Sequence, residues 1–129
     1  MALTKVVNIR IRSYDSHPRY LYIGRPSLYG NVFTHLLIDN LVVVPTQEDA
    51  VTAFRNWLYG RMFVNLKQTR RIDILQNIDE LEGKLLGCYC VPQLCHGNVY
   101  VKMLEEGYDI TIKGKRYHRQ SWRKEKQGV

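Results

Sequence analysis

Three cysteines and one of the four histidines lie within nine consecutive positions and are the residues best suited to chemistry. Cys88 and Cys90 are separated by one residue, whereas Cys95 and His96 are adjacent. Thiolates are nucleophiles, and thiolates and imidazoles are also the usual ligands of Zn²⁺. The segment therefore has three interpretations: a reactive thiolate at Cys95 assisted by His96, a zinc site, or buried core residues followed by a helix cap.

The cysteine segment spans a predicted strand and a predicted helix. The run LLGCYC over 85–90 predicts a strand, in which Cys88 and Cys90 share a face. Residues 96–106 are predicted as a helix that ends before Gly107. Ligands of open α/β sheets bind outside the carboxyl ends of the strands, where helix N-termini favour anions. The residues expected at such a site are Cys95 and His96, for any chemistry, and Gly97 and Asn98, for binding.

The zinc interpretation would use Cys88, Cys90, Cys95 and His96 as ligands. Structural zinc sites generally combine two C-x2-4-C pairs, whereas the spacing here is C-x-C-x4-C-H. The adjacent Cys95 and His96 are also expected to have difficulty reaching one tetrahedral ion. We therefore expect no cofactor, with zinc as the alternative that stays open.

A second loop, RPSLYGN over 25–31, follows a predicted strand over 20–24. An arginine guanidinium matches the geometry of phosphate or carboxylate, and a glycine allows close approach to the backbone. If this strand is parallel to the strand over 85–90, both loops open on the same edge of the sheet. The further ligand-binding residues expected at that edge are Asn8, Arg10, Arg25, Ser27, Gly30 and Asn31. An ordinary turn with a surface arginine is the alternative interpretation of the loop.

Strands and helices alternate along the chain, which predicts an α/β fold. We expect a single compact Rossmann-like domain over 1–112, with a central, mostly parallel sheet flanked by helices. The other predicted elements are strands over 5–12, 41–44 and 108–114 and helices over about 47–59 and 69–81.

The net charge of +7 is concentrated in residues 113–129, which hold seven Lys or Arg and one acid. Aromatic residues are interleaved with these bases, a pattern typical of segments that bind single-stranded nucleic acid or RNA. A solvated basic tail that aids solubility or contacts another subunit is the alternative. The candidate nucleic-acid contacts are Lys115, Arg116, Arg119, Trp122 and Arg123.

The remaining composition indicates a protein of the cytoplasm. The 129 residues contain no signal-peptide pattern and no apolar run of the roughly 20 residues that a membrane helix needs. The odd number of cysteines, three, favours a reducing compartment. No membrane partner is expected, and a homo-oligomer stays open.

Several of these motifs occur together in a known family. The run YIGRPS, the Gly30-Asn31 pair and the pattern CxCxPxxCHG resemble the domain-of-unknown-function 4326 family of phages and bacteria, over about residues 5–106. The resemblance implies one compact domain, a site at the two loops and a phage origin, hence the host cytoplasm. The family usually has Asp where this chain has Asn98, so binding without turnover is expected if the family uses that acid.

Together these features predict a protein that binds a small phosphorylated ligand, either a nucleotide or a nucleotide-derived metabolite. It would act in nucleotide metabolism or sequester a host nucleotide signal, with Arg25 pairing with the phosphate. Whether the ligand is turned over stays open. The alternatives are a nucleic-acid-binding protein that uses the basic tail and a zinc-stabilised structural or interaction module.

Overall fold

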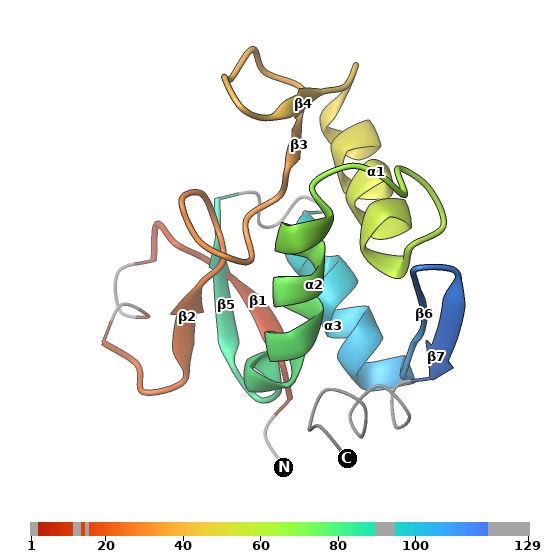
Figure 1. The fold of residues 1–129 in the computed structure, drawn as a ribbon. Helices are drawn as coiled ribbons and strands as arrows, with labels where there is room; N and C mark the ends of the chain where they lie inside the picture. Colours follow the sequence, from red (N-terminus) through yellow and green to blue (C-terminus); the bar gives the residue numbers. More distant parts are fainter. Residues whose placement is uncertain (1–2, 12–13, 15, 90–94, 119–129) are drawn as a thin grey trace.

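The computed structural model describes residues 3–11, 14, 16–89 and 95–118, and the structural statements below refer to these residues. A small parallel sheet lies beside a layer of helices (Figure 1). In spatial order, the strands of this sheet are β1 (Lys5–Asn8), β5 (Leu85–Cys88) and β2 (Tyr20–Tyr22).

The central strand, β5, is buried along its whole length and pairs in parallel with both neighbours. Gly87 lies opposite Val7 on one side and Tyr22 on the other. Because parallel strands end at the same edge, the segments that follow β2 and β5 emerge side by side. The expected parallel pairing of these two strands is therefore confirmed.

Three helices cover this sheet and one another. They are α1 (Gln47–Tyr59), α2 (Gln68–Asn77), which continues into the 3-10 turn η2 (Ile78–Leu81), and α3 (His96–Glu106). The Thr46 side chain accepts a hydrogen bond from the backbone N–H of Asp49 at 3.0 Å and caps α1. Gly60 ends the helix with φ +82°.

The predicted Rossmann-like central sheet is not confirmed, because the described strands divide among three small sheets. The strands β3 (Phe33–Thr34) and β4 (Val42–Val43) form a two-stranded parallel pair. The strands β6 (Asp109–Ile112) and β7 (Lys115–His118) form an antiparallel hairpin. The fold is nevertheless a mixed α/β arrangement of three helices and small sheets, as far as the described residues show.

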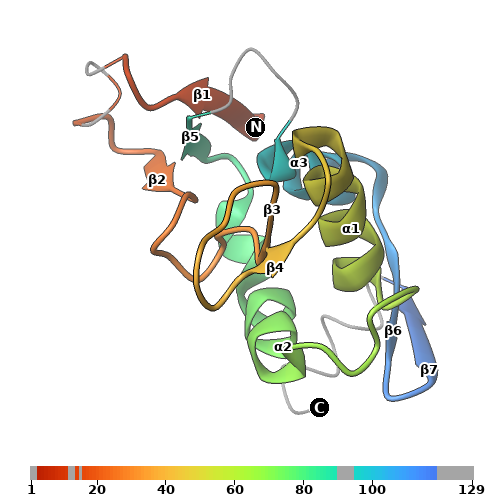
Figure 2. The ribbon, with the colours of Figure 1, turned by 90° about the horizontal axis from the view of Figure 1, so that it is seen from above.

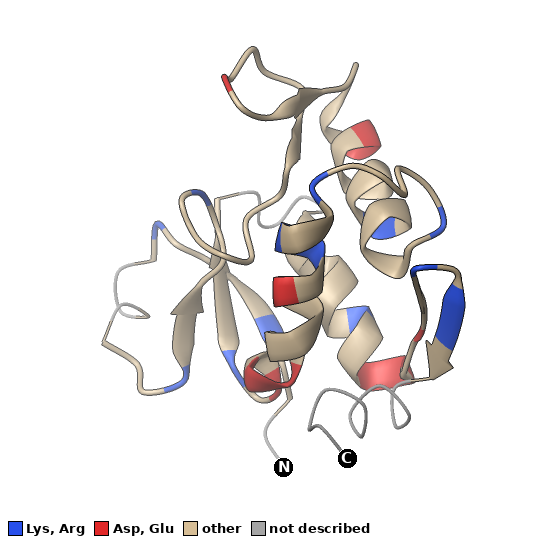
Figure 3. Cartoon of the chain, viewed as in Figure 1, with Lys and Arg blue, Asp and Glu red and all other residues tan. Residues whose placement is uncertain are grey.

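The turn between β6 and β7 explains why β6 pairs outside the main sheet. Lys113 and Gly114 both have positive φ, +51° and +81°, which is the pattern of a tight type I′ hairpin turn. The hairpin includes residues 115–118. The charge pattern predicts a basic tail from residue 113 onward, so the first part of that segment is a strand. Lys and Arg colour much of β7 in Figure 3.

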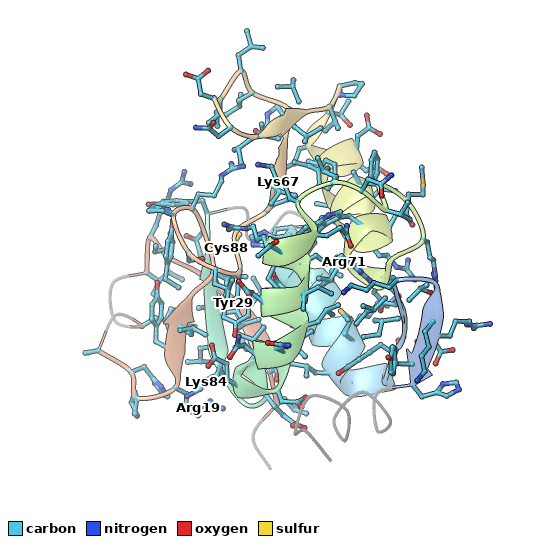
Figure 4. The ribbon with its side chains drawn as sticks, viewed as in Figure 1. Arg19, Tyr29, Lys67, Arg71, Lys84 and Cys88 are labelled. Carbon is cyan, nitrogen blue, oxygen red and sulfur yellow. The ribbon has the colours of Figure 1, made fainter. Side chains whose placement is uncertain are left out.

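A buried arginine attaches this hairpin to the helices. The Arg71 guanidinium, which is 2% exposed, donates hydrogen bonds to the carbonyl oxygens of Leu58 and Thr111 and to the side chain of Gln68 (Figure 4). Burial lowers the pKa of Arg71 to about 10, so the side chain stays cationic at neutral pH. Its polar partners compensate for much of the cost of burying that charge.

The helix α3 lies against the sheet and beside α1 (Figure 2). A Cβ atom added at Gly97, in its first turn, would lie 2.8 Å from Ile23 Cδ1 and 3.0 Å from Val6 Cγ2. The missing side chain therefore lets the start of α3 approach β1 and the residue that follows β2 closely. Among the described residues, none of the helices has the length and apolar composition that crossing a bilayer requires.

We predict that Gly97→Ala lowers the free energy of unfolding by about 1–3 kcal/mol, because the added methyl group overpacks the contact with the sheet. Urea denaturation measures the effect. Glu105→Ala, at an exposed position of the same helix, is the control and should stay within about 0.5 kcal/mol of the original chain. Equal stability of the two variants would contradict this account of the packing.

Candidate functional site

A cavity of about 260 Å³ lies where β2 and β5 end. Its walls come from the loop after β2, the strand β3 with the residues that follow it, and the first residues of α1 and α3. The described lining residues are Tyr22, Gly24, Arg25, Asn31, Phe33, Thr34, His35, Leu36, Gln47, Cys88, Tyr89 and His96.

The structure confirms that the loop after β2 and the segment after β5 meet at one cavity. Arg25 and Asn31 reach it from the first loop, and His96 reaches it from the start of α3. Cys88, which was assigned only to the zinc alternative, also lines it.

Arg25 is the exposed cation of the cavity wall. Its side chain makes one long hydrogen bond, 3.4 Å from Nη1 to the backbone oxygen of Asn31. Its own carbonyl accepts a 2.6 Å hydrogen bond from the Tyr22 hydroxyl, which holds the backbone of this residue. No described acid forms an ion pair with Arg25. The remaining N–H groups of its guanidinium can therefore donate hydrogen bonds to a ligand.

Asn31 braces the loop. Its Nδ2 donates to the carbonyl of Ala50 in α1 at 3.1 Å, and its Oδ1 accepts from the backbone N–H of Phe33 at 2.8 Å. These two bonds engage both ends of the amide. Asn31 therefore has a structural role, and its predicted role in ligand binding stays a prediction because the residue also lines the cavity.

Ser27 and Gly30 shape the loop behind Arg25. The Ser27 hydroxyl donates to the carbonyl of Gly24 at 2.6 Å, and the Ser27 carbonyl accepts from the Arg70 guanidinium at 2.6 Å. A Cβ atom at Gly30 would lie 3.0 Å from Arg25 Cγ. Neither Ser27 nor Gly30 is among the residues that line the cavity.

Two tyrosines, Tyr29 and Tyr100, anchor the same loop. Tyr100, in α3, donates from its buried hydroxyl to the carbonyl of Tyr29 at 2.8 Å. The Tyr29 hydroxyl lies within hydrogen-bond distance of the Asn77 carbonyl, at 3.0 Å, and of the Glu80 carboxylate. The two rings meet edge to face with their centroids 5.7 Å apart. These contacts tie the loop that carries Arg25 to both α2 and α3.

At the start of α3, the imidazole of His96 is 6% exposed and its Nε2 lies 2.9 Å from the Ile23 carbonyl. Because a carbonyl only accepts, Nε2 carries the proton and Nδ1 carries the lone pair. Cys95 is fully buried immediately before the helix. The Sγ atoms of Cys88 and Cys95 and a ring nitrogen of His96 lie within 4.8 Å of one another.

Gly97 and Asn98 have structural roles, and neither lines the cavity. Gly97 provides the close contact between α3 and the sheet. The binding roles predicted for both residues stay predictions. Asn98 accepts a 2.9 Å hydrogen bond from the backbone N–H of Cys95 through its Oδ1, which caps the helix. Asn98 lines a separate cavity of about 230 Å³ between α1 and α3.

The residues predicted on the first strand lie outside the cavity wall. The Asn8 side chain accepts a 2.8 Å hydrogen bond from the backbone N–H of Arg10 and so stabilises the turn after β1. Arg10 is exposed. Neither residue is part of the cavity lining.

Several lining residues were not predicted. His35 follows β3 directly, and Gln47 begins α1. No motif marks His35 or Gln47 in the sequence, because β3 is too short, at two residues, to give a recognisable strand pattern. Tyr22 and Tyr89 also line the cavity, and both are aromatic residues next to a predicted binding motif. That position was the signal in the sequence that could have identified them.

The candidate nucleic-acid residues are only partly described. On β7, Arg116 forms a 3.6 Å ion pair with Asp109, and the Lys115 ammonium lies 5.0 Å from the centroid of the Tyr117 ring. These exposed contacts place two bases on the hairpin surface. Arg119, Trp122 and Arg123, as well as Cys90 of the zinc alternative, lie outside the described residues. Binding of nucleic acid stays a prediction.

The tyrosine network predicts an alkaline limit of stability. Burial, followed by the hydrogen bond to Glu80, raises the pKa of Tyr29, and burial raises the pKa of Tyr100 well above its ordinary value. A tyrosine whose pKa is raised by folding contributes stability that is present below about pH 10 and is lost as the unfolded state ionises above it.

We expect Tyr29→Phe to lower the free energy of unfolding by about 1–3 kcal/mol at pH 8, through the lost hydrogen bonds. The difference from the original chain should narrow as the pH rises above 10, because only the original chain then loses the Tyr29 contribution. Urea denaturation from pH 8 to 11 tests this, with Tyr117→Phe on β7 as the control. If the difference in the free energy of unfolding between Tyr29→Phe and the original chain did not change with pH, the role assigned to Tyr29 would be refuted.

The comparison with known proteins agrees with the motifs quoted above. Over residues 7–106, the chain matches the family described as Domain of unknown function (DUF4326), as predicted. No curated protein and no solved structure matches the chain. Since the match covers both loops of the cavity and the three helices, the chain belongs to the DUF4326 family.

Proposed function

We propose that the cavity binds a small phosphorylated ligand, a nucleotide or a nucleotide-derived metabolite. The observation that supports this most is the exposed Arg25 guanidinium, which lines a concave surface and, among the described residues, makes a single long hydrogen bond. Arginine is well suited to phosphate because its planar group donates two parallel hydrogen bonds to two oxygens. An arginine in this position would set the orientation of the ligand.

The cavity offers a ligand more than a single cation. Gln47 and His35 add groups that can donate or accept hydrogen bonds, and Tyr22, Phe33 and Tyr89 add aromatic surface. Tyr89 is 56% exposed, which leaves much of its ring for contact with a planar group. A combination of one phosphate-binding cation with aromatic walls suits a nucleobase joined to a phosphate.

The rigid surroundings of the loop also favour binding. Hydrogen bonds from Arg70, Tyr100 and Asn31 hold the backbone around Arg25. A loop that the protein's own contacts hold in place loses less conformational entropy when a ligand binds. Nucleotide metabolism and the sequestration of a host nucleotide signal are the two activities that such a site would serve.

Calorimetry with nucleoside mono- and diphosphates, cyclic nucleotides, ribose 5-phosphate and inorganic phosphate tests the proposal. We expect Arg25→Ala to weaken binding about 10- to 100-fold, the loss of one or two charge-assisted hydrogen bonds. Arg10→Ala, which removes an exposed cation of the same edge that does not line the cavity, should leave affinity unchanged. No binding at millimolar concentrations, or equal binding by both variants, would exclude this function.

A second variant separates the nucleobase from the phosphate. We expect Tyr89→Ala to weaken the binding of nucleotides about tenfold, through lost stacking, and to leave inorganic phosphate unaffected. Tyr117→Ala, on β7 and outside the cavity lining, is the matched control. Equal losses for nucleotide and phosphate would show that Tyr89 supports the cavity rather than contacting a base.

A further inference from the structure

We propose that Cys88, Cys95 and His96 bind a thiophilic divalent transition metal, with Zn²⁺ as the best fit, at the inner end of the cavity. The donor atoms of the three residues lie within 4.8 Å of one another. Ligands of tetrahedral zinc, at Zn–S of about 2.3 Å and Zn–N of about 2.0–2.1 Å, lie roughly 3.5–3.8 Å apart. Closing the group around an ion therefore needs shifts of about one ångström.

The backbone explains how adjacent residues reach one position. Cys95 has an extended conformation, φ −140° and ψ 172°, whereas His96 is the first residue of the helix α3. The chain therefore changes direction between the two residues. The expectation that Cys95 and His96 would have difficulty reaching one ion is wrong, because their donor atoms lie close together. Cys88 joins them from the carboxyl end of β5 (Figure 4).

The surroundings of His96 are those of a metal ligand. A metal-binding histidine usually donates its other ring N–H to a carbonyl or carboxylate, which fixes the tautomer and the ring orientation. The 2.9 Å contact between Nε2 and the Ile23 carbonyl has that geometry, and the metal would then be bound through Nδ1. The rings of Phe54 and Tyr100, with centroids 5.4 Å and 5.9 Å from that of the imidazole, hold its plane edge to face.

The burial of the thiols also favours a soft metal. Cys88 is 4% exposed, Cys95 is fully buried, and neither forms a disulfide. Zn²⁺ would bind them as thiolates, with release of two protons, and the ion would neutralise the two negative charges that result. Oxygen-preferring ions such as Mg²⁺ and Ca²⁺ would find no carboxylate in this group.

The described residues supply three ligands, and a tetrahedral ion takes a fourth. Because Cys88 and His96 both line the cavity, we propose that water or a small anion from the cavity fills that position. Zinc sites with an open position are those that activate water or polarise a substrate. The metal proposal does not depend on the phosphorylated ligand. If the protein bound zinc but no phosphorylated ligand, the proposed function would be refuted and the metal site would stand.

The full chain purified under reducing conditions should contain one zinc ion per chain by elemental analysis. Its Co²⁺ form should show the sulfur-to-cobalt charge-transfer band and the d–d bands of a tetrahedral site. Removal of a ligand, in Cys88→Ser or His96→Gln, should weaken metal binding by more than the roughly 10- to 100-fold typical of a second-shell change. Azide should shift the d–d bands through the open position, and bands that do not respond would overturn that part of the proposal.

Two matched controls keep the assignment specific. His35→Gln changes a histidine of the same cavity that is not in the group, and Cys90→Ser changes the remaining cysteine. Both should retain the metal, and loss of zinc from Cys90→Ser would overturn the three-ligand site. If a ligand variant does not fold, as circular dichroism would show, the Co²⁺ spectrum of the original chain decides alone. Absence of the charge-transfer band there overturns the proposal.

Discussion

The structure depends on the close contact between α3 and the parallel sheet at Gly97. With no side chain at this position, the first turn of α3 lies against Val6 of β1 and against Ile23, which directly follows β2. The same contact sets the position of every group that α3 carries to the cavity. His96 reaches the Ile23 carbonyl from one side of it, and Tyr100, one turn later, reaches the loop after β2. A larger residue at position 97 would therefore displace the site as well as the helix.

A network of buried polar contacts converts this packing into an ordered loop. The Tyr100 hydroxyl, the Arg70 guanidinium and the Asn31 amide each bond to backbone carbonyls, so the loop gains hydrogen-bond partners without being part of a sheet. Arg71 does the same for the β6–β7 hairpin. Arg70 and Arg71 from α2 and Tyr100 from α3 thus attach segments outside the main sheet to the helices.

The cavity thus combines two chemically different ends. Arg25 is exposed and cationic, whereas Cys88, Cys95 and His96 are buried and form a sulfur-nitrogen group. The first end suits a phosphate, which is strongly hydrated and is best bound near solvent. The second suits a soft metal ion, which is held more firmly where water is excluded. The two proposals therefore concern one cavity but rest on separate observations and separate tests.

The sequence by itself determined the local features of this protein. Thr46 and Gly60 mark the ends of α1, and the motif residues identify the family, because caps and motifs depend on neighbours along the chain. It also predicted that Arg25 and His96 meet at one edge, since parallel strands end together.

Only the tertiary structure decided that Asn31 and Asn98 serve as a brace and a cap, and that Gly97 packs against the sheet. It likewise decided that Cys95 lies with His96 and Cys88. The reason is physical: a residue type states which bonds a side chain can make, but the partners of these side chains are distant in the sequence and are supplied by packing.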